Sequence, residues 1–171
     1  LLALALVLAL PFSAAAETFS TEDFTMEIPE GTYVFTPTTS TEDPNWAMAG
    51  VANPESELST LAEMNGVAEL VTEDGETTIL VQQQESDQTQ AYFNLRYLTE
   101  EQQADFLDAI MQSQTDEITV DKYYLDVDGQ PFYRIRIDGT YQETGYHELI
   151  YGTIVNGFTL AFNIYGGEES V

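Results

Sequence analysis

The chain has 171 residues, no cysteine, and 30 acidic against 4 basic side chains, which gives a formal net charge of −26. This charge excludes nucleic acid and anionic membrane surfaces as partners, because both require a basic patch. The missing cysteines exclude disulfides, thiolate catalysis and thiolate metal sites. An apolar share of 43% and an aromatic share of 12% are nevertheless typical of a chain that folds.

The first residues have the features of a secretory signal peptide. Residues 1–10 form an uninterrupted apolar run, and Ala14 and Ala16 supply a small-x-small cleavage site before Glu17. The run is shorter than the about 20 apolar residues that span a bilayer. We therefore expect a signal peptide at 1–16, truncated at its start, with cleavage near Ala16 and a secreted or extracytoplasmic product.

Residues 17–171 contain no linker or repeat and predict a single domain. Apolar alternation and turn residues predict a hairpin of strands 23–28 and 32–36, followed by a turn-rich stretch at 37–53 with one helical turn from Asp43. A helix cap then predicts a helix from Pro54 to about Asn65, and a hairpin of strands 67–72 and 77–84 follows it. The following segments predict a loop at 85–90, a short strand at 92–97, a helix from Thr99 to about Gln112, and a β-meander over 118–165.

The meander is predicted to contain strands near 118–127, 131–140, 146–155 and 158–165. Its Asp128-Gly129 and Asn156-Gly157 turns fix the register, because hairpin loop length sets strand pairing. Arg136 should then face Asp121, and Val155 should face Phe158. Both faces of the last hairpin are partly apolar, which favours a sheet covered on both sides. The fold class predicted is α+β, an antiparallel sheet flanked by helices in an α-β-α sandwich.

Two segments resemble the PsbP/Mog1-like group. They are FTMEIPEGTYVFTP at 24–37 and YGTIVNGFTLAFNIYGG at 151–167, and uncharacterised exported proteins of Gram-positive bacteria look most similar. The resemblance implies an α-β-α sandwich, and a final helix packed on the sheet that residues 17–171 are expected to lack. It also implies binding or assembly work in place of catalysis. No functional residue of the group has a counterpart here.

No residue set in the sequence predicts a catalytic centre, a cofactor or a metal site. His147 is the only histidine, and without a G-x-S-x-G nucleophile elbow we interpret it as a partly buried residue at the sheet edge. The Asp126-to-Gly129 segment is interpreted as a hairpin turn, because a calcium loop starting there would need Glu where Ile137 stands. At most, weak and diffuse binding of divalent cations to the acidic surface is expected.

Trp46 and Met48 are the candidate partner-binding residues. Trp46 is the only tryptophan and lies in the turn-rich stretch, and exposed tryptophans are enriched at binding hot spots. The alternative is that Trp46 pins this stretch to the core. The two interpretations differ in whether the indole is exposed or buried.

The sequence favours an exported, non-enzymatic binding or envelope-associated assembly module with a protein or envelope partner that it does not identify. Two alternatives stay open: an extracytoplasmic hydrolase that uses carboxylates or His147, and a small-ligand-binding module with a tyrosine-lined pocket. We also expect added salt or mild acid to raise the stability, because either relieves repulsion among the acidic side chains.

Overall fold

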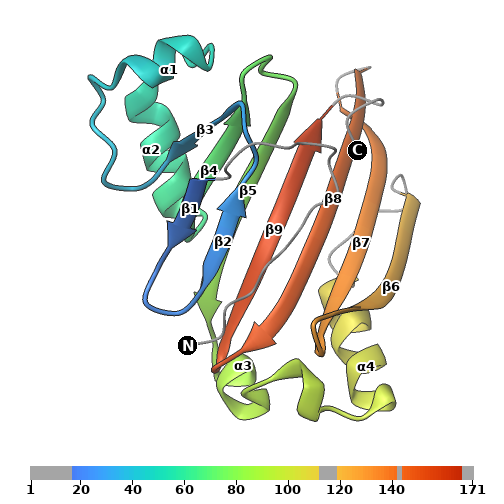
Figure 1. Ribbon diagram of the computed structural model, residues 1–171. Helices are drawn as coiled ribbons and strands as arrows, with labels where there is room; N and C mark the ends of the chain where they lie inside the picture. The colour runs from blue at the N-terminus through green and yellow to red at the C-terminus, as the bar shows by residue number, and fades with distance from the viewer. Residues whose placement is uncertain (1–16, 112–118, 142–143, 167–171) are drawn as a thin grey trace.

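The computed structural model describes residues 17–111, 119–141 and 144–166 (Figure 1). The expected signal peptide at 1–16 lies outside these residues, as do 167–171. Within the described part, no helix is both long enough and apolar enough to cross a membrane. The elements are β1 (Glu17–Ser20), β2 (Thr25–Ile28), β3 (Thr32–Phe35), α1 (Pro44–Met48), α2 (Pro54–Glu63), β4 (Gly66–Thr72), β5 (Thr77–Glu85), α3 (Asp87–Tyr92), the 3-10 helix η1 (Leu95–Tyr97), α4 (Glu100–Met111), β6 (Thr119–Val127), β7 (Gln130–Tyr141), β8 (Thr144–Val155) and β9 (Phe158–Gly166).

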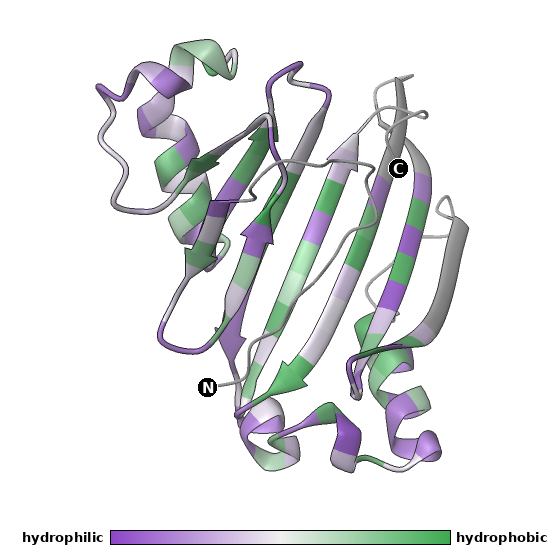
Figure 2. Cartoon of the chain, viewed as in Figure 1, coloured by the Kyte–Doolittle hydropathy of each residue, from purple (hydrophilic) through white to green (hydrophobic). Residues whose placement is uncertain are grey.

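A seven-stranded antiparallel sheet with the order β3-β4-β5-β9-β8-β7-β6 organises the fold, and β1 and β2 form a separate two-stranded sheet. The predicted fold class, α+β with an antiparallel sheet flanked by helices, is confirmed. Along the strands, apolar and polar residues alternate, as the green and purple bands of Figure 2 show. Each face of the large sheet therefore carries its own set of side chains.

We call the face of the large sheet that meets β1 and β2 the front face. Its core includes Leu70, Val81, Leu160 and Phe162, and the partner layer contributes Phe24, Met26 and Ile28, all of them buried. Strands β2 and β3 lie where the sequence predicts them, but they do not form the predicted hairpin. Instead, β2 pairs with β1 and β3 pairs with β4. The reason is burial: β2 places its apolar residues on the front face instead of extending the sheet.

The opposite, back face carries two groups of helices near opposite ends of the sheet (Figure 1). Trp46 of α1 and Leu58 of α2 pack with Phe35 and Val71 on the β3–β4 side. Leu95 of η1 and Phe106 and Leu107 of α4 pack with Tyr133, Ile135, Ile137 and Ile154 on β7 and β8. In the described residues the helices thus cover one face, and the β1–β2 pair covers part of the other. This part of the chain therefore does not have the helical layer on both faces that the expected α-β-α sandwich requires.

The meander has the predicted register. Asp121 pairs with Arg136 across β6 and β7, and Val155 pairs with Phe158 across β8 and β9. Both tight turns use the left-handed conformation at each central residue, with φ of 52° and 80° at Asp128-Gly129 and of 53° and 85° at Asn156-Gly157. These are the angles that two-residue hairpin loops require. The side chain of Asp121 lies outside the described residues, and the guanidinium of Arg136 pairs with Asp138 at 3.0 Å.

Both long helices begin where their caps predict. Asn53 caps α2 by accepting a hydrogen bond from the Ser56 N–H at 3.3 Å, and Thr99 and Gln102 exchange hydrogen bonds at the start of α4. Helix α2 ends at Glu63, and the left-handed conformation that follows it belongs to Asn65, with a φ of 55°.

The segment 85–97 differs from the prediction of a loop and a strand, because it forms α3 and η1. Ser86 caps α3 through reciprocal hydrogen bonds with Thr89, which give this polar segment a helical start. Leu95 is fully buried in the core between the helices and the back face. Leu95 thus packs on the back face of the sheet without belonging to a strand. The apolar residues of 92–97 that suggest a strand are there for burial and not for strand pairing.

A ring-over-glycine contact supports the centre of the back face and generates a stability prediction. Gly152 pairs with Tyr133, and a Cβ added to Gly152 would lie 2.1 Å from Cζ of that ring. We expect Gly152→Ala to lower the free energy of unfolding by about 1–3 kcal/mol, because the ring must move. Urea unfolding measures this loss. In a Tyr133→Leu background the loss should shrink; an equal loss in both backgrounds would show that the ring is not its cause.

Candidate functional site

The first candidate residue, Trp46, is part of the core. Its side chain is 2% exposed and stacks on Phe35, with ring centroids 3.6 Å apart and ring planes 8° apart. The indole Nε1–H donates to the carbonyl oxygen of Ser40 at 2.9 Å. The expectation of an exposed indole is therefore wrong, and the alternative, a side chain that pins the 37–53 stretch to the sheet, describes its position. Trp46 is the buried residue that attaches the short helix α1 to the sheet, so its indole is not available to a partner.

The second candidate residue, Met48, lies at the end of α1 with 61% of its surface exposed. Whether it contacts a partner stays a prediction. The structure thus separates two residues that the sequence places together, because one helical turn points Trp46 inward and Met48 outward.

The remaining sequence candidates contribute no catalytic or metal centre to the described structure. His147 on β8 pairs with Asp138 on β7. The side chain of His147 lies outside the described residues, so the role of this histidine stays a prediction. The Asp126-to-Gly129 segment forms the predicted turn, in which the Gly129 N–H donates to Asp126 Oδ1 at 2.9 Å. Among the described residues, no group of three or more His, Asp or Glu side chains is placed to hold a metal ion.

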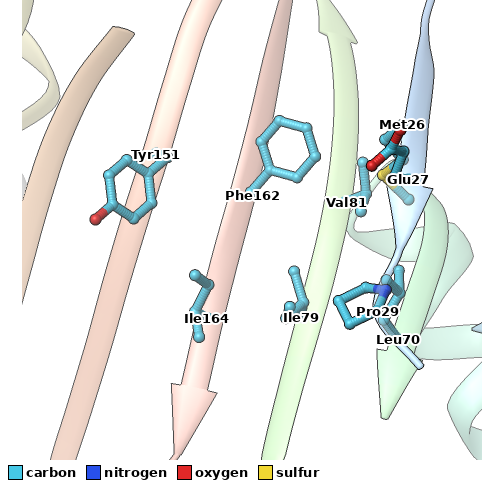
Figure 3. Close-up of a pocket in the computed structure, with 9 residues that line it drawn as sticks. All are labelled: Met26, Glu27, Pro29, Leu70, Ile79, Val81, Tyr151, Phe162 and Ile164. Atoms are coloured by element: carbon cyan, nitrogen blue, oxygen red, sulfur yellow. The ribbon is translucent and has the colours of Figure 1, made fainter. Parts of the chain in front are cut away.

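A shallow apolar groove lies on the front face beside β2 (Figure 3). Met26 and Pro29 stand on one side of it, Tyr151 stands on the other, and Phe162 and Ile164 lie between them in the view. Its volume is about 20 Å³, which is close to the space of a single water molecule. A space of this size does not enclose a small-molecule ligand.

A larger cavity lies on the back face between α2 and the sheet, and we call it the α2 cavity. Its volume is about 160 Å³, and it is lined by Glu57, Thr60, Leu61, Met64, Glu69, Thr78, Leu80 and Tyr165. Helix α2 brings Glu57, Thr60 and Leu61, its C-cap residue is Met64, and β4, β5 and β9 bring the others. Leu61 and Leu80 are buried and form apolar walls, and Met64 is 38% exposed.

The pKa values of two ionisable groups in the α2 cavity are raised. Burial raises the pKa of the half-buried Glu69 carboxyl, and the negative charge of Glu57 raises it further. Burial likewise raises the pKa of the Tyr165 phenol, with a further contribution from Glu148, its partner across β8 and β9. The α2 cavity therefore contains acidic side chains whose negative charge is poorly solvated.

A chain of amide hydrogen bonds holds the floor beside this cavity. Gln82 on β5 donates from Nε2 to the carbonyl oxygen of Met64 at 2.7 Å, which ties the sheet to the end of α2. Asn163 on β9 donates from Nδ2 to Gln82 Oε1 at 2.5 Å. These bonds give the polar side chains of the back face partners inside the protein.

No pattern in the sequence predicts the α2 cavity, although one residue indicates it. Glu69 interrupts the apolar strand β4 at a position whose side chain faces the covered back face of the sheet. A charged residue on a covered face is unusual unless it meets a partner or a cavity. Only the pairing of β5 with β9 shows which side chains surround it.

The comparisons with known proteins show the fold. No protein-family model and no curated protein sequence matches the chain. Among solved structures, the chain is similar to the solution structure of cyanobacterial PsbP (CyanoP) from Synechocystis sp. PCC 6803, with 12% identity and a TM-score of 0.52. The match covers 93% of this chain and 85% of that one. The PsbP-like fold implied by the sequence resemblance is thus confirmed, and identity this low carries the fold alone.

The burial of Trp46 predicts a large stability effect. Trp46→Ala should lower the free energy of unfolding by about 3–5 kcal/mol, because it removes the stacked partner of Phe35 and leaves a cavity. Met48→Ala, on the same helix, should change it by less than about 0.5 kcal/mol. Chemical unfolding of both variants tests this. Equal stability losses for the two would contradict the assignment of Trp46 to the core.

The raised pKa of Glu69 predicts a stability change that depends on pH. A carboxyl whose pKa is raised by folding stabilises the folded state below its unfolded pKa, and this stabilisation is lost as the pH rises through the folded pKa. We therefore expect Glu69→Gln to raise the melting temperature at pH 7, with the gain vanishing below about pH 4, where Glu is protonated in both states.

The control for this prediction is Glu76→Gln. Glu76 is exposed in the β4–β5 turn, so its replacement removes the same charge from the surface without relieving burial. A gain as large for Glu76→Gln as for Glu69→Gln would show that general repulsion, and not the environment of Glu69, causes the effect.

Proposed function

We propose that the protein is a non-enzymatic binding module that works outside the cytoplasmic membrane and helps to hold or assemble envelope proteins. The observation that carries this proposal is the small size of the front groove and the α2 cavity, about 20 Å³ and about 160 Å³, in the part of the chain that the structure describes. Sites for small molecules usually have volumes of about 300–1,000 Å³. A space of about 160 Å³ accepts a single side chain, and single buried side chains are how protein partners anchor to one another.

The fold and the sequence supply further support. A PsbP-like sheet covered by helices and by a β1–β2 layer offers broad, rigid surfaces. The signal-like residues 1–16, and the resemblance of 24–37 and 151–167 to exported proteins of Gram-positive bacteria, favour a place outside the membrane.

The two alternatives are less well supported by the cavity geometry. A hydrolase could use Glu57 and Glu69, whose charges interact, but their cavity has about half the volume at which substrate sites begin. A ligand-binding module would need a pocket lined by several tyrosines, but each cavity has only one: Tyr151 in the front groove and Tyr165 in the α2 cavity. Each cavity is again smaller than the sites that usually enclose a small-molecule ligand.

The location is tested on the full chain expressed in its native host. We expect the protein outside the cytoplasmic membrane, with an N-terminus at Glu17 when its mass is measured. A chain that keeps residues 1–16 and stays in the cytoplasm would contradict the proposal.

The binding role is tested in the same cells with a photoreactive residue placed at Met48, beside the front groove at Glu27, or at the control position Glu76. We expect irradiation to give an adduct of defined mass with an envelope protein at Met48 or Glu27, and not at Glu76. No adduct at either position, or the same mixture at all three, would contradict a binding function that uses these surfaces.

A further inference from the structure

The α2 cavity has the size and the walls of a receptor for one long side chain. A volume of about 160 Å³ is close to the about 150 Å³ that encloses a benzene molecule. Leu61 and Leu80 provide buried apolar walls, and Met64 adds a partly exposed flexible side chain. These walls suit the aliphatic stem of a lysine or arginine, which packs on apolar surface while its head seeks polar contacts.

The α2 cavity contains negative charge, and the helix and strands that line it contain no basic residue. Glu57 and Glu69 line it, and both are half-buried. The chain has only four basic residues, and they lie on other elements: Arg96 in η1, Lys122 on β6, and Arg134 and Arg136 on β7. Along the sheet, β8 and β7 separate the cavity strand β9 from β6. The elements α2, β4, β5 and β9 therefore bring carboxylates and no counter-charge.

We propose that the α2 cavity receives one arginine or lysine side chain of a partner protein, an inference that rests on the protein-binding function proposed above. The stem lies against Leu61 and Leu80, and the cationic head meets Glu57 and Glu69 at the rim. A cation there offsets both the burial of Glu69 and its repulsion by Glu57, the two causes of the raised pKa of Glu69.

Other occupants fit the cavity less well. A divalent metal takes six or more oxygen ligands, whereas only two of the eight residues that line this cavity are carboxylates. The described residues also contain no group of three acids or histidines placed to hold a metal ion. An anion would meet two carboxylates. A basic protein segment, by contrast, is attracted from a distance by the net charge of −26 and reaches a site that distinguishes one side chain.

The binding test uses purified full chain with labelled methyl groups and two capped tripeptides, Gly-Arg-Gly and Gly-citrulline-Gly. Citrulline has nearly the shape of arginine without its charge. We expect the arginine peptide to shift the methyl resonances of Leu61, Leu80 and Met64, and the citrulline peptide to leave them in place. Glu69→Gln should weaken binding of the arginine peptide by about tenfold, as expected for loss of a charged hydrogen-bond partner.

Matched variants separate the cavity from the acidic surface as a whole. Glu76→Gln removes an equal charge from the exposed β4–β5 turn and should leave the affinity unchanged. Thr60→Tyr places a ring at the cavity and should abolish binding, whereas Ser59→Tyr, an exposed neighbour on α2 outside the lining, should not. Glu57→Gln provides a second charge variant if Glu69→Gln is poorly folded.

Three results would overturn the inference. Equal shifts with the citrulline peptide would show that charge is irrelevant. Equal weakening by Glu69→Gln and Glu76→Gln would show diffuse attraction to the surface. Methylguanidinium binding as tightly as the tripeptide would show a site for free small cations in place of a protein side chain.

A photoreactive residue at Thr60 in the native host separates failure of this inference from failure of the proposed function. Adducts at Met48 or Glu27 with none at Thr60 would leave the binding function standing and reject the α2 cavity as its contact. No adduct at any of the three positions would reject the binding function itself. An adduct at Thr60 that Glu69→Gln abolishes and Glu76→Gln preserves is the result we expect.

Discussion

The pairing of β5 with β9 joins the two halves of the chain, and the rest of the fold depends on it. Nine residue pairs connect 77–85 with 158–166, so the last strand lies at the centre of the sheet, between β5 and β8. This pairing joins the strands β3-β4-β5 and the strands β9-β8-β7-β6 into one sheet. It also gives the front face a continuous core, in which Val81 of β5 meets Phe162 of β9.

Apolar burial has to hold this protein together, because its charges cannot. With 4 basic against 30 acidic residues, most carboxylates have no possible counter-ion in the chain. The Arg136–Asp138 pair is part-exposed, and pairs of that kind contribute about 0–1 kcal/mol. Burial on both faces of the sheet is therefore the main favourable term, and it must also offset the mutual repulsion of the surface. Such a chain tolerates few polar residues inside unless they are hydrogen-bonded, as Gln82 and Asn163 are.

The features that the sequence predicted are those set by local chemistry. Turn residues such as Asn156-Gly157 determine a register within two residues of chain, and caps such as Asn53 determine where a helix begins. The errors arise where distant contacts decide. Pairing of β2 with β1 instead of β3, the helical state of 87–97 and the burial of Trp46 all depend on which surface a short apolar segment finds. The α2 cavity combines residues from four elements, so no window of the sequence contains it.

The width of the sheet explains why a polar strip and a cavity exist on the back face. Seven strands spaced about 4.8 Å apart span about 29 Å, whereas a helix with its side chains covers about 10–12 Å. Helix α2 packs beside β4 and helix α4 packs on β7 and β8, so these two helix widths leave a strip of several ångströms between them. Polar side chains stand in this strip, among them Gln82, Asn163 and Tyr165. The carboxyl of Glu69 lies at its α2 side, where burial is incomplete and the α2 cavity remains between the helix and the sheet.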